Sequence, residues 1–327
     1  MRRIWTVFPV FLILCFASGC AKKVDNGNVT SVNMAFQNWV GYGPFYLAQD
    51  KGFCREEGVE LNFVDEPLDS ARMVAFKAGM LDFEGGTLDL LVSKVAGGAP
   101  IVAVMEIDTS FGSDAIVAAA DIKTLDDLEG KSVVLARDDV GETFLSYLFY
   151  KKGITLDKVK MVSYNSEFVA EAFLKGEAEA CVTWEPQVSE ALKRPGAHIL
   201  ASTREYPDVI IDTLNVRRDL LEKDPGLVKG LMRAWFKALK YYRDEPEEAS
   251  AIIAAYYEIT PEEYRKQAEG LLWKSYEEQK SELAEKWIEV FDLIAKIKFD
   301  NERIILKPEA VASVNRKLLE RLYEDSE

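Results

Sequence analysis

Apolar and polar positions along the chain alternate between two periods, one of two residues and one of about 3.6. Short segments of the first kind are each followed by a segment of the second kind, which predicts strands that alternate with helices. The strand-like segments are residues 32–36, 59–64, 81–83 and 101–105, and the helical ones are 44–51, 69–78 and one that opens at Thr87 or Asp89. This order predicts a mostly parallel sheet.

A second series of the same kind begins after Asp114. Its strand-like segments are 115–119, 132–136, 159–162 and 180–182, and its helical ones are 125–131, 143–152 and 167–175. From about Pro225 onward the spacing is helical, over 227–243, 246–257, 261–272, 281–296 and 308–322. The sequence therefore predicts two α/β lobes and a helical C-terminal region.

Composition excludes several classes of function. The chain has 327 residues, of which 48% are hydrophobic and 29% charged, a profile typical of a globular protein. Its 55 acidic residues outnumber 40 basic ones, and the formal charge of −15 argues against a nucleic-acid partner. The one histidine, His198, lies in a segment that we interpret as a turn. The chain therefore lacks the histidines needed for a multi-histidine metal site, and its single histidine argues against a histidine-assisted nucleophile.

The N-terminus has the features of an export signal. A charged start, Met1–Arg3, precedes an apolar run over 4–17 that is short for a membrane span. The tetrad Ala-Ser-Gly-Cys at 17–20 resembles a bacterial lipobox, with Ala where Leu is usual. We expect cleavage after residue 19 and lipidation of Cys20; the alternative is an ordinary signal peptide with an incidental cysteine.

Cleavage would leave an acidic protein on a short tether. The net charge changes from −15 to −17 because Arg2 and Arg3 leave with residues 1–19, and residues 20–31 are small and polar, which suits a tether. Cys54 and Cys181 could form one disulfide, but their spacing favours two separate buried thiols.

Five segments, in order and spacing, resemble one family of binding proteins. They are WVGYGP at 39–44, AGMLDF at 78–83 with GTLD at 86–89, DTSFGSDAIV at 108–117, LDDLEGKS at 125–132, and GEAEA at 176–180 with WEP at 184–186. The chain is thereby similar, over about residues 32–250, to the solute-binding proteins of ABC importers for nitrate, alkanesulfonates, taurine and the pyrimidine precursor of thiamine.

The resemblance implies a type II periplasmic-binding-protein fold, in which two lobes close over a solute. Lobe one would comprise 32–113 and 216–327, including the C-terminal helices, and lobe two 116–211, with crossings near 113–118 and 210–216. The implied partners are a small-molecule solute and the permease and ATPase of an importer, with the membrane reached only through the lipid. We expect a monomer without a cofactor or metal.

Ligands of open α/β sheets bind outside the carboxyl ends of the strands, and several side chains fall there in this sequence. Candidate flat walls are Trp39, Tyr42, Phe111 and Trp184, for which simple core packing is the alternative. The polar candidates are Thr87, Asp108, Asp114, Glu142, Glu185 and Asp212.

The polar candidates are mostly acidic, which decides the expected ligand. A sulfonate or nitrate would favour cations and free N–H groups at the helix start near 137–143, where three carboxylates oppose it. We therefore expect a small nitrogenous solute, an amine, amidine or amino-heterocycle such as a pyrimidine. A taurine-like zwitterion or alkanesulfonate is the rival.

Other interpretations stay open at this level. Asp138 and Asp139 could only cap a helix, Asp114 could make a hinge bond, and Glu185 could face solvent. The protein could also be a ligand-sensing lipoprotein without a transporter. An exported enzyme is disfavoured, because the fungal enzymes of this fold consume a histidine and need a cysteine cluster, and His198 lies outside every motif.

Overall fold

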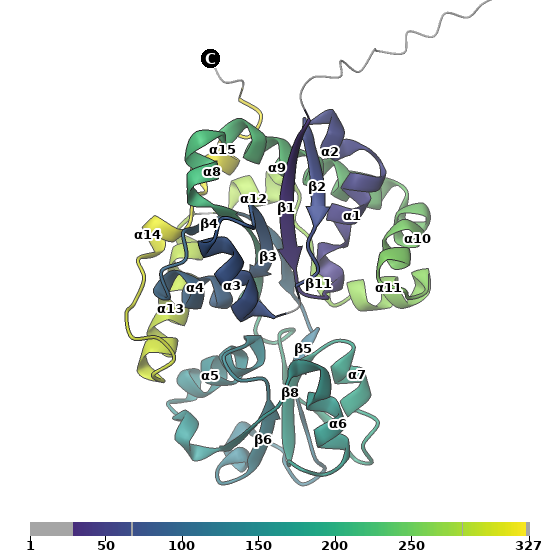
Figure 1. Ribbon diagram of the computed structural model, residues 1–327. Helices are drawn as coiled ribbons and strands as arrows, with labels where there is room; N and C mark the ends of the chain where they lie inside the picture. Colours follow the sequence, from purple (N-terminus) through teal and green to yellow (C-terminus); the bar gives the residue numbers. More distant parts are fainter. Residues whose placement is uncertain (1–28, 67, 283, 325–327) are drawn as a thin grey trace, which may run out of the picture.

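The computed structural model describes residues 29–66, 68–282 and 284–324, and it forms two lobes that each contain one sheet (Figure 1). The expected signal peptide and Cys20 lie outside the described residues. Lobe one contains a six-stranded sheet of order β11-β4-β10-β3-β1-β2. Its strands are β1 (Thr30–Phe36), β2 (Val59–Phe63), β3 (Phe83–Thr87), β4 (Ile101–Ser110), β10 (Ile211–Arg217) and β11 (Leu271–Leu272).

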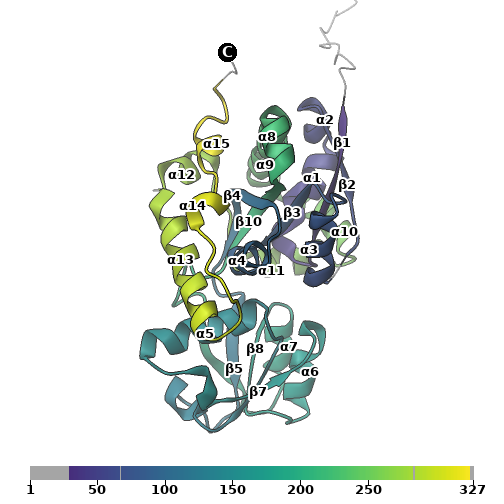
Figure 2. The ribbon, with the colours of Figure 1, turned by 60° about the vertical axis from the view of Figure 1, so that its left-hand side comes forward.

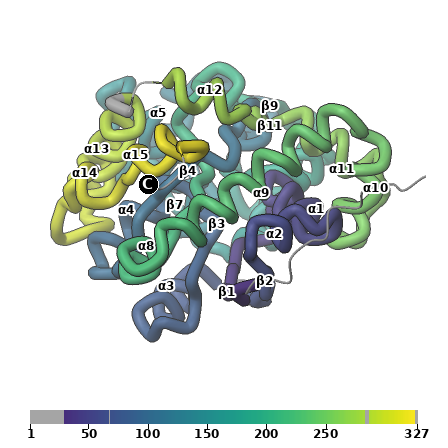
Figure 3. Tube along the Cα trace, turned by 90° about the horizontal axis from the view of Figure 1, so that it is seen from above, coloured from purple at the N-terminus to yellow at the C-terminus, as the bar shows by residue number. Residues whose placement is uncertain are grey.

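Helices cover both faces of this sheet, and seen from above each side of the molecule has helices from both the N-terminal and the C-terminal part of the chain (Figure 3). The N-terminal ones are a 3-10 turn (Val40–Tyr42), α1 (Gly43–Asp50), α2 (Phe53–Glu56), α3 (Asp69–Lys77) and α4 (Leu88–Ala96). The later ones are α8 (Arg218–Lys223), α9 (Pro225–Asp244), α10 (Pro246–Tyr256), α11 (Pro261–Ala268), α12 (Tyr276–Ser281), α13 (Ala284–Asp300), α14 (Ala310–Ser313) and α15 (Lys317–Glu320).

Each face of this sheet has its own apolar core. One core joins the sheet to α1, α9 and α10 around the fully buried Trp235. The other joins it to α3, α4 and α13 around Trp287. Removing several aromatic and aliphatic side chains from water on both faces is the main stabilising contribution to lobe one.

Lobe two contains a five-stranded sheet of order β7-β6-β8-β5-β9. Its strands are β5 (Asp114–Ala118), β6 (Ser132–Leu135), β7 (Lys160–Ser163), β8 (Ala180–Trp184) and β9 (His198–Ser202). Its helices are α5 (Val140–Lys152), α6 (Val169–Leu174) and α7 (Gln187–Ala191), with 3-10 turns at Leu125–Leu128, Leu156–Lys158 and Ser166–Phe168.

Both sheets are mixed, but most of their strands run in one direction, in agreement with the prediction of a mostly parallel sheet; the exceptions in the described residues are β10 and β11 in lobe one and β5 in lobe two. Strand β1 is parallel to β2 and β3, but β10 is antiparallel to β3 and β4. In lobe two, β5 is antiparallel to β8 and β9. The reason is the passage of the chain between the lobes, because the strands that carry it across run against their neighbours.

The two crossings are short. Strand β4 ends at Ser110 and β5 begins at Asp114, and the chain returns between Ser202 and Ile211. The expected return near 210–216 falls within β10, which pairs with β3 and β4 in lobe one. Residues 211–215 therefore pair in the sheet of lobe one, although the sequence boundary placed them before it.

Two helices expected in the C-terminal region are shorter than predicted. The helix expected over 261–272 ends at Ala268, and residues 271–272 pair with β4 instead. The helix expected over 308–322 is two short helices separated by residues 314–316, of which Val314 bridges to Ala103. His198 begins strand β9 rather than lying in a turn. Cys54 and Cys181 are separate free buried thiols, as expected. None of the helices in the described ranges is long and apolar enough to cross a membrane.

Candidate ligand-binding site

Two aspartates stand opposite each other in the sheet of lobe one. Asp212 on β10 pairs in register with Asp108 on β4, and on its other side with Thr87 at the end of β3. Asp108 exposes 0% of its surface and Asp212 exposes 3%. Like charges directly opposite each other in an antiparallel pair are destabilising. A contribution to fold stability therefore does not explain why both positions are aspartate.

Burial makes these two carboxyls hard to ionise. It raises the pKa of Asp108 well above its ordinary value, and the neighbouring charge of Asp212 raises it further. Burial also raises the pKa of Asp212, against a hydrogen bond from Tyr42 that lowers it. A positive charge placed between the two would reverse both shifts.

Two aromatic residues of the loop after β1 donate to the pair. The Tyr42 hydroxyl donates to Oδ1 of Asp212, and the Trp39 indole Nε1 donates to Oδ2 of Asp108 at 3.3 Å. Oδ1 of Asp108 is buried and has no hydrogen-bond partner within the described residues. An unpartnered buried carboxylate oxygen is costly, and a ligand donor is one way to satisfy it.

The C-terminal helices hold this loop in place. The Tyr257 hydroxyl donates to the carbonyl of Trp39 at 2.6 Å, and the Trp273 indole donates to the carbonyl of Gly41 at 3.1 Å. Glycine is required at position 41, because a Cβ there would lie 1.9 Å from Oδ2 of Asp108. The loop can therefore bring Trp39 and Tyr42 to the aspartates only with a glycine between them.

Lobe two contributes a third aspartate and an aromatic wall. Asp114, the first residue of β5, pairs in register with Trp184 at the end of β8 and exposes 4% of its surface. Burial raises the pKa of Asp114 to about 7, although a hydrogen bond with Ser110 lowers it. Trp184 is half-buried and packs against the apolar cores of both lobes, which places it between them.

A fourth carboxylate lies at the start of α5. Asp139 caps this helix by accepting from the N–H of Val140 at 2.7 Å. Burial raises its pKa to about 6, and the charge of Asp89 on α4 contributes to the shift. Asp89 itself accepts a hydrogen bond from Thr143 of α5 at 2.7 Å, so the helix start of lobe two meets lobe one here.

The cluster contains more negative than positive charge. Lys298 pairs with Asp89 at 3.2 Å, and Lys274 pairs with the nearby Glu106 at 2.9 Å. The four other carboxylates form no ion pair within the part of the chain that the structure describes; they are Asp108, Asp114, Asp139 and Asp212. Asp139 is half-buried and the other three are buried. Carboxylates withdrawn from water without a cation are the groups that a positively charged ligand would stabilise.

Most of the residues selected from the sequence lie together here. Trp39, Tyr42, Thr87, Asp108, Asp114, Trp184 and Asp212 come from the ends of neighbouring strands or from the loops that follow them. Asp108 and Asp212 lie within strands β4 and β10 rather than in the loop and crossover expected for them, because both strands are longer than their apolar runs.

Three of the selected residues have other partners, and we do not propose them as ligand contacts. The ring of Phe111 is covered by the Arg204 guanidinium at 4.7 Å. Glu142 is bound by Arg303 at 2.6 Å. Glu185 accepts from the backbone and hydroxyl of Ser189, at 3.1 and 3.0 Å, and supports the start of α7.

A groove of about 400 Å³ adjoins the site at the carboxyl ends of β1 and β2. The pattern of strands and helices in the sequence does not predict this groove, because its walls come from α1 and α10 as well as from the strands. It is lined by Met34, Phe36, Gln37, Asn38, Tyr46, Phe63, Val64, Asp65, Tyr256, Tyr257 and Glu258. Phe36 packs on Tyr42 with ring centroids 4.9 Å apart, so the groove and the aspartate cluster share a wall.

Comparison with known proteins places the chain in a family. Residues 39–249 match the model of the NMT1/THI5-like family, and the chain belongs to that family. A Brucella abortus protein named as a binding protein is 25% identical over 65% of this chain and 67% of its own length. The taurine-binding periplasmic protein of Escherichia coli is 25% identical over 66% of this chain and 68% of its own length.

Solved structures share the fold. The periplasmic aliphatic sulphonate-binding protein SsuA of Escherichia coli matches with a TM-score of 0.74 and 18% identity, covering 88% of this chain and 98% of SsuA. SsuA of Xanthomonas axonopodis, bound to MOPS, matches with a TM-score of 0.72 and 15% identity, covering 88% and 99%. The predicted periplasmic-binding-protein fold is confirmed. The desulfurization enzyme DszB has a related fold, with a TM-score of 0.61 and 14% identity over 89% of this chain and 98% of DszB.

Proposed function

We propose that this protein is an extracytoplasmic solute-binding protein of an ABC importer, and that it binds a small nitrogenous cation between its lobes. The ligand class is an amine, an amidine or an amino-heterocycle such as a pyrimidine. Its protonated nitrogen would lie at Asp108, Asp212 and Asp114, and its flat or apolar part would lie against Trp184.

One observation carries this proposal: Asp108 and Asp212 are paired in register, both are buried, and neither has a cationic partner in the described residues. A protonated nitrogen would supply the missing charge and donate to the unpartnered Oδ1 of Asp108. Within the described ranges, no group of three or more histidine, cysteine or acidic side chains is arranged to hold a metal ion. This favours an organic cation over a metal.

The taurine-binding relative supports a second candidate, a zwitterion. The ammonium of such a ligand would use the same carboxylates, but its sulfonate would need donors of its own. The polar groups that the cluster offers are mostly acceptors, and Lys298 and Lys274 are already paired with carboxylates. We therefore rank a zwitterion below a cation, and a simple sulfonate or nitrate below both.

Binding rather than catalysis is supported by the state of the possible nucleophiles. Burial raises the pKa values of Cys54 and Cys181 to about 12, so neither thiol ionises readily near neutral pH. His198 lies on β9 and takes no part in the cluster. Similarity to DszB shows that the fold also accommodates an enzyme, so the proposal rests on the site rather than on the fold.

We propose export and lipid anchoring through Cys20 on the basis of the N-terminal sequence and the periplasmic relatives. The same relatives support a permease and an ATPase as partners. A ligand-sensing lipoprotein that serves no transporter would have the same site. Co-purification with a permease from the native membrane would distinguish the two.

The test is a ligand panel read by thermal shift and calorimetry. Amines, amidines and aminopyrimidines should raise the melting temperature, and replacing Asp212 by Asn should abolish the effect. Taurine should have a smaller effect, and nitrate and simple alkanesulfonates none. Stabilisation by nitrate or sulfonates, with none from nitrogenous cations, would overturn the proposed ligand class.

A further inference from the structure

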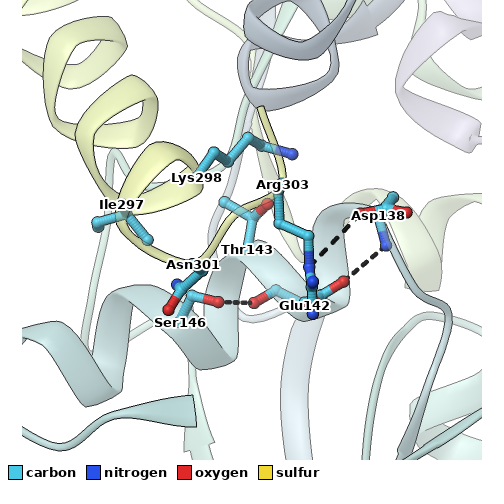
Figure 4. Close-up of a pocket in the computed structure, with 8 residues that line it drawn as sticks. All are labelled: Asp138, Glu142, Thr143, Ser146, Ile297, Lys298, Asn301 and Arg303. Atoms are coloured by element: carbon cyan, nitrogen blue, oxygen red, sulfur yellow. Dashed lines mark hydrogen bonds and ion pairs between the residues drawn. The ribbon is translucent and has the colours of Figure 1, made fainter. Parts of the chain in front are cut away.

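Helix α13 and the loop after it lie along lobe one and reach α5 of lobe two (Figure 2). We call residues 286–303 the strap. At its far end, the Nε atom of Arg303 lies 2.6 Å from Oε1 of Glu142, and Nη2 of Arg303 lies 2.5 Å from the same oxygen (Figure 4). Asp138 lies 3.5 Å from the Nε atom of Arg303. The guanidinium of lobe one is therefore bound to the first turn of α5 in lobe two.

A second contact joins the same elements through Asp89. Lys298 of the strap and Thr143 of α5 both approach Oδ2 of Asp89, at 3.2 and 2.7 Å. Lys298 and Asp89 expose only 5% and 3% of their side chains. One carboxylate oxygen of lobe one is thus shared by a cation of lobe one and a hydroxyl of lobe two.

The space between the strap and α5 is nearly filled. A cavity of about 10 Å³, room for about one water molecule, is lined by Asp138, Glu142, Thr143, Ser146, Ile297, Lys298, Asn301 and Arg303. It is too small for a solute, so this region is a contact between the lobes rather than a second binding site. At the other end of the strap, Lys286 pairs with Asp208 of the return crossing at 2.9 Å.

The contact lies next to the proposed ligand site. Glu142 accepts from the N–H of Asp138 at 2.7 Å, and the next residue, Asp139, caps α5 and faces the charges of Asp89 and Asp114. The position of the first turn of α5 therefore decides where the carboxylate of Asp139 lies. That turn is held on its outer side by Arg303.

We propose that Arg303 is a positioning residue, which holds α5 against lobe one in the closed form and so places Asp139 at the edge of the ligand site. The part of this inference that concerns ligand affinity rests on the proposed function, while the part that concerns closure does not. Arginine suits the role because both nitrogens reach one carboxylate oxygen, which the single ammonium of lysine cannot reproduce.

The experiment compares three variants of the whole protein. Arg303→Ala removes the contact, and Arg303→Lys keeps the charge without the two-nitrogen contact. Lys307→Ala is the matched control, since Lys307 is a cation four residues beyond Arg303 whose ammonium lies over the ring of Phe299 in lobe one, 4.7 Å from its centroid. A fourth variant, E142R combined with R303E, exchanges the charges and should restore part of the contact.

Closure is measured without any ligand, by small-angle scattering and by a cross-link. Asn301 and Ser146 face each other across the contact (Figure 4), so cysteines at both positions should oxidise to a disulfide. Arg303→Ala should enlarge the radius of gyration and slow this cross-link, while Lys307→Ala changes neither. Equal scattering and equal cross-linking in all variants would overturn the proposal.

Affinity is measured with the amine or aminopyrimidine that gives the largest thermal shift. Arg303→Ala should raise the dissociation rate about tenfold, with Arg303→Lys between it and the wild type. If Arg303→Ala alters closure but no cation binds, the positioning role of Arg303 is supported and the proposed ligand class is refuted. Cation binding with a dissociation rate unchanged by Arg303→Ala would refute the positioning role and leave the ligand class standing.

Discussion

The carboxylates of Asp108 and Asp212 face each other across β4 and β10, with Tyr42 and Trp39 as their hydrogen-bond donors. Neither has a cation beside it in the described residues, so ionising both costs free energy in the ligand-free protein. Replacing either by asparagine removes that cost and keeps a similar shape. Asp212→Asn and Asp108→Asn should each stabilise the ligand-free protein at pH 8 by about 1–3 kcal/mol and weaken cation binding at least tenfold.

Urea denaturation and calorimetry together check this prediction. A merely structural role for the aspartates would give the opposite stability change, because the variants would then lose a stabilising contact. Loss of stability in both variants at pH 8 would contradict the assignment of these residues to a cation site.

The raised pKa values also predict how the stability of the ligand-free protein depends on pH. Burial raises the pKa of Asp114 to about 7 and that of Asp139 to about 6, above the ordinary value of about 3.9 in an unfolded chain. Between about pH 4 and pH 7 the folded ligand-free protein therefore holds more protons than the unfolded one. The stabilisation that Asp114 and Asp139 contribute should therefore be complete below about pH 4. It should be lost progressively as the pH rises to 7.

Cation affinity should change in the opposite direction. A ligand whose charge is constant over this range, such as an amidinium, favours the ionised carboxylates and releases protons when it binds. Its affinity should rise from pH 5 to pH 8, and calorimetry in buffers of different ionisation enthalpy should detect the released protons. An affinity that falls over this range would indicate an anionic ligand.

Gly41 offers a test of the loop that carries Trp39 and Tyr42. In Gly41→Ala the new methyl group meets the carboxylate of Asp108, so the loop or the carboxylate has to move. We expect at least tenfold weaker binding and a modest loss of stability, about 1–3 kcal/mol, as in other overpacked sites. Gly97→Ala is the matched control, because a Cβ there has no contact closer than 3.4 Å. Equal affinity in both variants would show that the loop does not meet the ligand.

Glu185 and Asp114 test which carboxylates of lobe two meet the solute. Glu185 is occupied by Ser189, whereas Asp114 is buried opposite Trp184. Glu185→Gln should leave the dissociation constant within about twofold of the wild type, and Asp114→Asn should raise it tenfold or more. A larger loss of affinity in Glu185→Gln than in Asp114→Asn would indicate that Glu185 contacts the ligand.

The sequence predicts the two-lobed fold, and it identifies most of the cluster because the carboxyl ends of strands can be located from the apolar runs. It places Asp108 in a loop because Glu106 and Asp108 interrupt the apolar pattern of β4, although both are fully buried. For the same reason residues 211–217, with Asp212, Thr213 and Asn215, are not recognised as a strand. Buried polar residues therefore make β4 and β10 difficult to predict from the apolar pattern, and the same residues belong to the candidate ligand-binding site.

Other features depend on contacts between distant segments, which local patterns do not report. Glu142 lies at the expected helix start, but its direction toward Arg303 depends on the strap, 161 residues further along the chain. Glu185 lies at the expected strand end, but local hydrogen bonds from Ser189 tie its carboxylate to the first turn of α7. The sequence offers helix capping as one interpretation of Asp139, and only the approach of Asp89 from lobe one adds it to the cluster.

Tyr257, Tyr264 and Trp273 donate to three successive carbonyls of residues 39–41. All three lie beyond residue 249, where the match to the family model ends. The matched segment thus contains the loop that carries Trp39 and Tyr42, while the side chains that hold the backbone of this loop come from outside the matched segment. Chimeras that exchange only residues 39–249 between family members should therefore not transfer solute preference intact.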